Sequence, residues 1–445
     1  MRVAVLGGGI AGLAAAWKLL QGGHTPIVFE AADVPGGKIR SVELDGYLLE
    51  LGPHAILPSY TALYNALDGL GLTDQYLPGN PEGTHRFICL DGRPEPLPMG
   101  LGALIKTPLL TGRAKWRLLK EPFIAKMEGD ESVADFFTRR LGPEVVTRLI
   151  DPFISGVYAG DPAQLSMAAA FPVLKELERE GGSLFKGGLA RMRKTRKQAA
   201  KSGDFPKPKG GMYAFKKGLQ ELPLALARAL GDNLRLGTPI KELSPAGDRW
   251  RVNGETFEAV VSTIPVPDWA ALGAGVYPQI KLEYATVAVA HLSYPREAVK
   301  TRTDGFGMLI PAVEKRRILG LLFDSSLFPG RAPEGEHLFT IFLGGQRNRW
   351  IKKESPESLL GIAHGETADL MGIGSQVKPA LSHLHIWEHA IPQYGFQYAD
   401  FLQHLQKFEA SHPNWAFAGS YRQGISVGHS FESGLDAAQR LADRA

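Results

Sequence analysis

Cysteine is almost absent from this sequence, and its scarcity limits the chemistry and the compartment that fit the chain. The 445 residues contain one cysteine, Cys89, so no disulfide can form within the chain. Such sparse use of cysteine fits a reducing compartment. Cys89 follows Phe87 and Ile88, and we interpret it as a small buried core residue rather than as a nucleophile.

Long hydrophobic runs are missing as well. No stretch approaches the roughly 20 consecutive apolar residues that a membrane-spanning helix needs. The sequence opens directly into a short apolar segment, so we expect no cleavable signal peptide. These absences predict a cytoplasmic protein that is either soluble or peripheral on the cytoplasmic face of the membrane.

Neither sign of charge is in large excess. The formal net charge of +4 does not by itself indicate a nucleic-acid partner. Residues 186–209 are rich in lysine and arginine and poor in large apolar residues, which predicts a mobile basic loop. This segment lacks the interleaved aromatic side chains that would stack on bases, so we expect no nucleic-acid partner.

No catalytic constellation of side chains stands out in the sequence. We find neither a Ser-His-Asp pattern nor a pair of carboxylates spaced for acid–base work. The apolar content of 44% and the charged content of 22% are those of a globular protein. The length predicts two or three domains.

The strongest positive signal is a glycine-rich segment near the start of the chain. The apolar run Val3–Leu6 reads as a buried strand, and Gly7, Gly9 and Gly12 follow it in a GxGxxG spacing. The first glycine permits a tight turn, the second lets the backbone approach a pyrophosphate, and the third lets helix and strand pack closely. The phosphates would sit at the positive end of a helix that begins with Ile10-Ala11.

A second apolar strand strengthens this interpretation. Ile27–Phe29 delivers Glu30 to the position where an acid binds a ribose hydroxyl, and Ala31 follows. The alternative is a glycine-rich turn without a ligand. The combined context predicts a dinucleotide cradle.

The residues after this strand distinguish the flavin dinucleotide from the nicotinamide one. Gly36-Gly37-Lys38 and then Gly52-Pro53-His54 resemble the extended FAD motif of the flavin amine oxidase superfamily. The resemblance implies FAD as the cofactor, with these residues in contact with it. The superfamily usually has arginine where this chain has Lys38, and lysine offers a charge without a planar fork.

Two later segments complete the expected cofactor site. The resemblance places Val260 and Thr263, in the strand 259–263, on the adenine side of FAD. Near the C-terminus, a strand, a glycine turn and a helix start predict a site that faces the flavin ring. Its expected contacts are Gly419, Ser420, Ser426 and Val427.

The middle of the chain narrows the resemblance. The succession GVYAGDP, LS, AFP and GSL at residues 156–184, with IPQY at 391–394, resembles the protoporphyrinogen oxidase family. That family includes coproporphyrinogen III oxidases. The resemblance implies oxidation of a porphyrinogen to a porphyrin, with dioxygen as acceptor and hydrogen peroxide as product. An amine oxidase or a carotenoid desaturase would share the ends of the chain but lack these central elements.

The same resemblance implies a substrate pocket. It places Arg86 where a guanidinium pairs with a propionate of the substrate. It places Gly156 opposite, where the missing side chain would leave space for the macrocycle. A cation exposed at a strand end is the alternative for Arg86.

Two other features leave alternatives open. Residues 99–127 mix apolar side chains with cations, which suits either an anionic membrane surface or a helical subdomain with solvated charges. His383, His385 and His389 invite a metal site, but His383 and His385 alternate as on one strand face and no fourth ligand stands near. We therefore expect no metal.

The fold class follows from these assignments. We expect an α/β protein with a discontinuous Rossmann-like FAD-binding domain, a mixed-sheet substrate domain and a helical membrane-side subdomain. The expected bounds are 1–80, 205–275 and 395–445 for the first; 81–95, 160–204 and 276–394 for the second; and 96–159 for the third.

Overall fold

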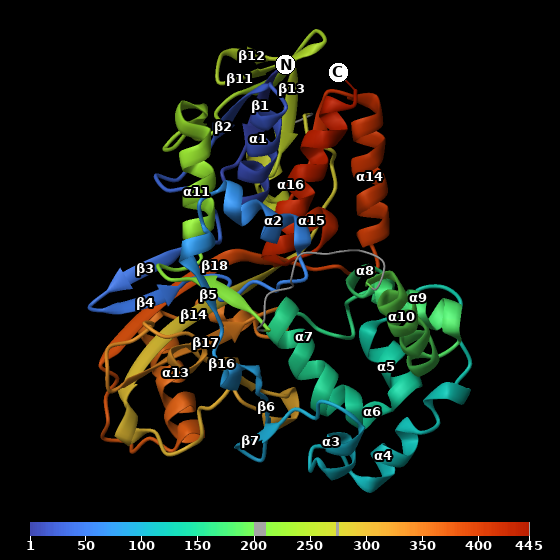
Figure 1. The fold of residues 1–445 in the computed structure, drawn as a ribbon, viewed down its shortest axis with the longest axis vertical. Helices are drawn as coiled ribbons and strands as arrows, with labels where there is room; N and C mark the ends of the chain where they lie inside the picture. The colour runs from blue at the N-terminus through green and yellow to red at the C-terminus, as the bar shows by residue number, and fades with distance from the viewer. Residues whose placement is uncertain (200–210, 273–275, 445) are drawn as a thin grey trace.

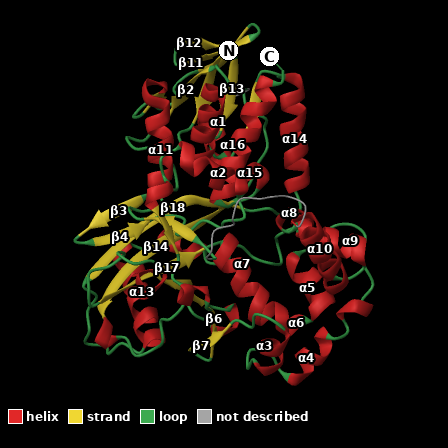
Figure 2. Cartoon of the chain, viewed as in Figure 1, coloured by secondary structure: helices red, strands yellow, loops and turns green. Residues whose placement is uncertain are grey.

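A computed structural model describes residues 1–199, 211–272 and 276–444 of the chain. Three regions are visible in Figure 1: a unit at the top that holds both termini, a large sheet at the lower left, and a group of helices at the lower right. Figure 2 shows that strands dominate the left region and helices the right one. The expected α/β class with parallel and mixed sheets is confirmed.

The top unit is built on a parallel five-stranded sheet. Its order is β19 (Trp415–Phe417), β13 (Ala259–Ser262), β1 (Arg2–Leu6), β2 (Thr25–Phe29) and β9 (Leu234–Arg235). The central strand is buried from residue 3 to residue 6, which explains why it is an uninterrupted apolar run. The sheet therefore unites segments that lie far apart in the sequence.

Helices and small sheets surround this sheet. The helices are α1 (Ile10–Gln21), α2 (Thr61–Gly69), α11 (Glu221–Leu230), α14 (Tyr398–Ser411), α15 (Ser420–Gln423) and α16 (Val427–Ala442). The small sheets are β3 (Ser41–Leu44) with β4 (Tyr47–Glu50), β5 (Tyr76–Pro78) with β8 (Tyr213–Phe215), and β10 (Leu243–Ala246), β11 (Arg249–Val252) and β12 (Glu255–Phe257).

The lower left region is a mixed seven-stranded sheet. Its order is β18 (Leu381–Pro392), β14 (Tyr284–Pro295), β17 (Glu336–Gly344), β16 (Ile318–Phe323), β15 (Gly307–Leu309), β6 (Arg86–Leu90) and β7 (Arg93–Pro96). Only the β15–β6 pair is parallel among the described strands of this sheet. One face packs in an apolar core with α13 (Pro356–Met371), and that core includes buried Cys89.

The lower right region is helical. Its elements are α3 (Leu101–Lys106), α4 (Gly112–Leu118), η3 (Glu121–Phe123), α5 (Val133–Leu141), α6 (Pro143–Val145), η4 (Val146–Ile150), α7 (Asp151–Tyr158), α8 (Met167–Ala170), α9 (Pro172–Gly181) and α10 (Leu184–Ala199). Short helices elsewhere are α12 (Asp324–Leu327), η1 (Thr73–Gln75), η2 (Pro81–Thr84), η5 (Gly231–Asn233), η6 (Val266–Leu272), η7 (Arg296–Ala298), η8 (Ala312–Glu314) and η9 (Arg349–Lys353).

Helix α10 corrects one expectation from the sequence. Residues 186–199 belong to this helix and not to a loop, whereas residues 200–209 lie outside the described part of the chain. Lysine, arginine, glutamine and alanine are good helix formers, so a basic segment need not be a loop. The helix packs closely on α9, because a Cβ on Gly181 would lie 2.6 Å from Gly187 Cα.

Candidate functional site

The glycine turn after β1 is closed by short contacts. Gly7 has a φ of 102°, in the left-handed region that favours glycine. The Thr263 hydroxyl lies 2.9 Å from the Leu6 carbonyl oxygen and 3.2 Å from that of Gly7, and donates between them. A Cβ on Gly12 would lie 2.0 Å from the Gly7 carbonyl oxygen. Only glycine at position 12 therefore lets α1 approach the turn this closely.

The space beside Gly9 fits a phosphate. A Cβ on Gly9 would meet no described atom within 4 Å. Gly9 is the N-cap of α1, no described side chain caps this end, and the first turn contains no acidic residue. The free N–H groups of such a helix end carry partial positive charge. The cradle thus has both the room and the electrostatic sign for a pyrophosphate.

A second glycine segment closes the cradle. The Gly36 N–H donates to the Gly8 carbonyl at 2.8 Å, and a Cβ on Gly37 would lie 3.2 Å from Gly9 Cα. Gly36 and Gly37 both have a positive φ, at 120° and 58°. Residues 36 and 37, which the sequence assigned to the cofactor, therefore lie directly against the glycine turn.

Glu30 lies at the end of β2, beside the same turn. Its carboxylate accepts from the Gly8 N–H at 2.6 Å and from the Ala32 N–H at 2.8 Å. Ala31 is exposed next to it. This is the place in which the sequence predicts that an acid binds a ribose hydroxyl.

Helices α1 and α16 run side by side in the same direction (Figure 1). A Cβ on Gly434 would lie 2.1 Å from the Ala11 carbonyl oxygen, so the two backbones are in contact. Gly434 is seven residues after the first residue of α16, whereas Ala11 is one residue after the first residue of α1. At a rise of about 1.5 Å per residue, this difference of six residues makes the N-terminal end of α16 extend about 9 Å past that of α1. The Ser426 hydroxyl caps α16 by accepting from the His429 N–H at 3.1 Å, and Val427 is the first helical residue.

Two tyrosines hold the glycine turn that precedes α16. The Tyr394 and Tyr398 rings are stacked with their centroids 4.0 Å apart. The Tyr394 hydroxyl donates to the Ser420 carbonyl, and the Tyr398 hydroxyl donates to the Tyr421 carbonyl at 3.0 Å. Gly419 precedes these residues with a φ of 125°. The IPQY element of the sequence therefore positions the turn assigned to the flavin ring.

Comparison with known proteins identifies the class to which this cradle belongs. The family described as flavin-containing amine oxidoreductase matches residues 10–442. This chain belongs to that family. It is therefore an FAD-dependent oxidoreductase, and the glycine turn, the end of α1 and Glu30 stay the predicted contacts of the dinucleotide.

Individual members of the family match along nearly the whole chain. The mitochondrial protoporphyrinogen oxidase of Nicotiana tabacum is 35% identical, over 98% of this chain and 94% of the relative. The protoporphyrinogen oxidase of Homo sapiens is 32% identical, over 98% and 97%. The coproporphyrinogen III oxidase of Bacillus subtilis (strain 168) is 28% identical, over 98% and 96%. A solved structure of reduced UDP-galactopyranose mutase shares the fold, with a TM-score of 0.75 at 17% identity, over 100% of this chain and 96% of that one.

Lys38 is a partly buried cation beside the flavoprotein cradle. Its ammonium nitrogen lies 5.3 Å from the centroid of the Tyr284 ring. Burial lowers the pKa of Lys38 from 10.5 to about 8, although nearby Asp268 raises it. None of the ion pairs among the described residues includes Lys38. It is thus a cation that remains available to an anionic ligand.

Side chains of the large sheet hold the segment 50–54. The His291 ring donates through Nε2 to the Glu50 carbonyl at 3.1 Å, and Trp387 donates through Nε1 to the Leu51 carbonyl at 2.6 Å. A Cβ on Gly52 would lie 1.9 Å from the Lys38 carbonyl oxygen. The turn Gly52-Pro53-His54 is therefore fixed between the cradle and the sheet.

Arg86 and Gly156 lie on the same side of the large sheet. In the parallel β6–β15 pair, Arg86 is opposite Gly307 and Ile88 is opposite Leu309, so these four positions share one face. A Cβ on Gly156 of α7 would lie 2.4 Å from Leu309 Cδ2. Arg86 is half-buried on the face that α7 covers, with its guanidinium carbon 5.8 Å from the centroid of the Phe306 ring.

The contact with Leu309 gives Gly156 a role in packing. The end of the Leu309 side chain lies where a Cβ on Gly156 would be, so glycine lets α7 pack directly on β15. The expected role of Gly156 beside the substrate stays a prediction. Its backbone remains exposed.

Val260 and the polar residues under the 50–54 turn show where sequence reasoning falls short. The Val260 side chain is 0% exposed inside the sheet, so only its backbone could reach a cofactor. The sequence interpretation assigned no role to His291, Asp324 and Thr340, which are buried under this turn. A signal was present: His291 interrupts a run of small apolar residues, and Asp324 directly follows a buried strand.

The remaining features concern metals and membranes. His383 and His385 lie on strand β18 as expected. Among the described residues, no group of three histidine, cysteine or acidic side chains is arranged to hold a metal ion. In the same residues, no helix combines the length and apolar character needed to cross a bilayer.

Proposed function

We propose that the protein oxidises protoporphyrinogen IX to protoporphyrin IX in haem biosynthesis, with dioxygen as acceptor and hydrogen peroxide as product. The observation that carries this proposal is the similarity to relatives named protoporphyrinogen oxidase along 98% of the chain. Six electrons and six hydrogens leave the substrate in three steps. Each step reduces one dioxygen to one hydrogen peroxide.

The chain has a limited task in this chemistry. Bound FAD supplies the acceptor for each two-electron step. The methylene bridges of the substrate are activated C–H donors, so the protein mainly positions the macrocycle and keeps water from it. The sheet face toward the cradle suits that task, because Val287, Val289 and Leu319 form an apolar cluster there.

Reduction of the flavin by substrate tests the proposal. Anaerobic addition of protoporphyrinogen should bleach the flavin absorbance, and admission of air should restore it together with porphyrin fluorescence. An amine oxidase would be bleached by an amine instead. A flavin-binding protein without this activity would not be bleached by either compound.

Coproporphyrinogen III is the second candidate substrate. The Bacillus subtilis relative named for that reaction supports it. The two porphyrinogens carry two and four propionates, so the number of cations at the pocket decides between them. Specificity constants measured for both compounds on the same preparation would rank them.

Arg86 is the proposed partner of a propionate. It is half-buried on the sheet face under α7, and its guanidinium forms no ion pair among the described residues. A guanidinium binds a carboxylate through two parallel hydrogen bonds, each charged bond contributing about 1.5 to 3 kcal/mol.

Arg86→Ala should therefore raise KM about tenfold or more and leave the FAD content unchanged. Arg93→Ala, at an exposed position on the neighbouring strand β7, is the matched control. Unaltered kinetics in Arg86→Ala would show that Arg86 is only a surface charge and binds no propionate.

We further propose that the helical region attaches to the cytoplasmic face of an anionic membrane. Exposed apolar side chains gather here at Ile105 (72%), Trp116 (73%) and Phe123 (86%). Lys106 and Lys120 are exposed beside them. Insertion of the apolar side chains and attraction of the cations to anionic lipids would both strengthen membrane binding. Salt would weaken only the electrostatic attraction.

Flotation with liposomes tests this attachment. The wild type should float with anionic liposomes at low salt and less at high salt. Replacement of Trp116 and Phe123 by serine should reduce flotation at both salt concentrations, whereas serine at exposed Ile386, on strand β18 of the large sheet, should not. Absence of wild-type binding at low salt would remove the proposal.

A further inference from the structure

The segment 344–347, at the end of strand β17, holds both ends of helix α7. Gly344 and Gly345 have positive φ values of 101° and 82°, which favour glycine and turn the chain toward the helix. At the end of α7, the Gln346 N–H donates to the Ala159 carbonyl at 2.8 Å. A Cβ on Gly345 would lie 2.6 Å from the same carbonyl oxygen. The backbones of helix and sheet are therefore in direct contact at this end.

Asp151 fastens the other end of α7, and its side chain is 7% exposed. One carboxylate oxygen, Oδ1, pairs with Arg347 Nη1. The other, Oδ2, accepts from the Ala312 N–H at 2.9 Å. Both partners belong to the region of the large sheet, Arg347 just after β17 and Ala312 at the start of η8. A single carboxylate on the helix therefore uses both of its oxygens on the sheet.

The helical backbone before Asp151 gives α7 limited support of its own. Residues 146–150 form a π-helical turn between α6 and α7. Pro152 has no N–H, so it cannot donate to the carbonyl of residue 148 as another residue would in a continuous helix. Helices bend at prolines and at such turns. The contacts with the sheet therefore decide where α7 lies.

The face of α7 that these contacts orient borders the predicted substrate space. Phe153, Gly156 and Val157 are exposed at i, i+3 and i+4 spacing, so they share one face of the helix. Gly156 packs on Leu309, which lies on the same face of the sheet as Arg86. A shift of α7 would therefore change the width of the space beside Arg86.

We propose that the pair of Asp151 and Arg347 holds α7 at a fixed distance from the sheet and thereby sets the position of the substrate. The two are positioning residues, because they act through α7. The effect on the substrate rests on the proposed function. The anchoring of α7 does not, because it is measured without substrate.

Hydrogen exchange followed by mass spectrometry measures the anchoring in the FAD-loaded protein. In Arg347→Ala, the amides of α7 should exchange about tenfold faster than in the wild type, and those of α1 should be unchanged. Arg347→Lys retains the cation and should lie closer to the wild type. Arg317→Ala is the matched control, because Arg317 pairs with Glu354 at 3.4 Å, with side chains that are 48% and 32% exposed. Wild-type exchange in Arg347→Ala, or an equal rise in Arg317→Ala, would overturn the proposal.

Asp151→Asn tests whether both carboxylate oxygens are needed, and it keeps the size of the side chain. An amide has one acceptor oxygen, so it can accept from Ala312 or from Arg347 but not from both. Exchange in α7 should therefore rise about tenfold here as well, and the double variant with Arg347→Ala should add little. Fully additive effects would contradict the pairing. This variant decides the anchoring even if Arg347→Ala does not fold.

Steady-state kinetics separate positioning of the substrate from a merely structural role. Arg347→Ala should raise KM for protoporphyrinogen about tenfold and keep kcat and the FAD content within about twofold, because the cradle is unchanged. Arg317→Ala should keep all three values. A fall in kcat or in FAD content with an unchanged KM would overturn the role in substrate positioning. If the wild type oxidises no porphyrinogen, the proposed function fails, and exchange in α7 still supports or overturns the anchoring.

Discussion

Two buried polar clusters in this protein handle charge in opposite ways. In the helical region, Arg140, Glu121 and Glu178 are 0 to 1% exposed and fully paired. Under the Gly52–His54 turn, the equally buried Asp324 and His54 form no ion pair with a lysine or arginine among the described residues, and burial raises the pKa of Asp324 and lowers that of His54. The first cluster retains its charges by pairing them, whereas in the second burial disfavours the charged form of both groups.

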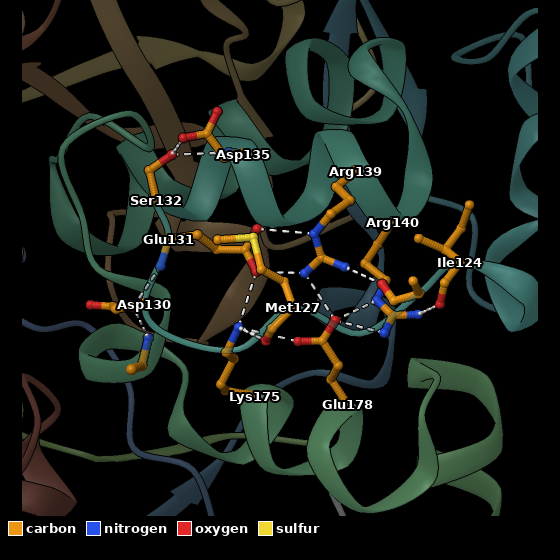
Figure 3. Close-up of polar contacts among 12 residues, drawn as sticks. Ile124, Met127, Asp130, Glu131, Ser132, Asp135, Arg139, Arg140, Lys175 and Glu178 are labelled. Atoms are coloured by element: carbon orange, nitrogen blue, oxygen red, sulfur yellow. Dashed lines mark hydrogen bonds and ion pairs between the residues drawn. The ribbon is translucent and has the colours of Figure 1, made fainter.

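The geometry of the helical cluster explains why its charges persist (Figure 3). Arg140 donates to Glu178 at 2.8 Å, to Glu121 at 3.1 Å and to the carbonyls of Ile124 and Gly182 at 3.0 and 3.1 Å. Burial alone would raise the pKa of Glu178, but hydrogen bonds from Arg140, Arg139 and Lys175 lower it below its ordinary value. A buried charge is stable only with this degree of pairing.

The difference between the clusters matches their places in the fold. The charged cluster ties α5, α9 and η3 together, far along the chain from the cradle. The cluster of Asp324 and His54 lies under the turn assigned to FAD, where a fixed charge would interact with any charge that develops on a ligand. One set of buried polar groups therefore joins helices, and the other joins the large sheet to the turn assigned to FAD.

The largest expected effect is that of breaking the charged cluster. Arg140→Ala leaves Glu121 and Glu178 buried without their main partner, so the free energy of unfolding should fall by about 3 to 5 kcal/mol. Denaturant unfolding followed by circular dichroism measures this loss. A change below about 1 kcal/mol would show that solvent reaches the cluster and that the contrast drawn above is wrong.

Sequence reasoning could predict the cradle because its constraints are local. The glycines at 7, 9 and 12 and the acid at 30 are set by one strand–turn–helix unit, and the structure shows the expected close contacts at Gly7 and Gly12. FAD as the cofactor and the flavin oxidoreductase family are confirmed. The contacts of individual residues with FAD remain predictions.

The two buried clusters could not be predicted in the same way. Glu121, Arg140 and Glu178 come from three helices, and Asp324 meets Thr340 and His54 only after the sheet has formed. No local pattern links residues that pair across such distances in the sequence. A polar residue inside an apolar run can be noticed in advance, but its partner is decided by the tertiary fold.

Lys38 tests a third arrangement, in which a partly buried cation forms no ion pair among the described residues. Its pKa is lowered to about 8, chiefly by burial, so the protein without FAD loses this cation as the pH rises above 8. If the FAD phosphates require the cation, the Kd for FAD should increase about fivefold between pH 8 and 9, or about 1 kcal/mol. Quenching of flavin fluorescence on binding to the FAD-free protein measures Kd. Lys38→Arg retains its charge across this range and should show a nearly flat profile; a flat wild-type profile would separate Lys38 from the phosphates.

The smallest expected effect comes from an ion pair on the same helix as Glu178. Arg179 and Glu176 are one helical turn apart on α9, at 3.6 Å, with side chains that are 75% and 46% exposed. Glu176 and Glu178 are two positions apart and so lie on opposite faces of the helix, one toward water and one toward Arg140.

Because water already solvates the exposed pair, Arg179→Ala should change the free energy of unfolding by about 0 to 1 kcal/mol, and added salt should reduce even that. The same denaturant experiment as for Arg140→Ala measures it. A loss in Arg179→Ala equal to that in Arg140→Ala would mean that burial does not set the strength of these pairs, because the two arginines have the same chemistry and contact carboxylates of one helix.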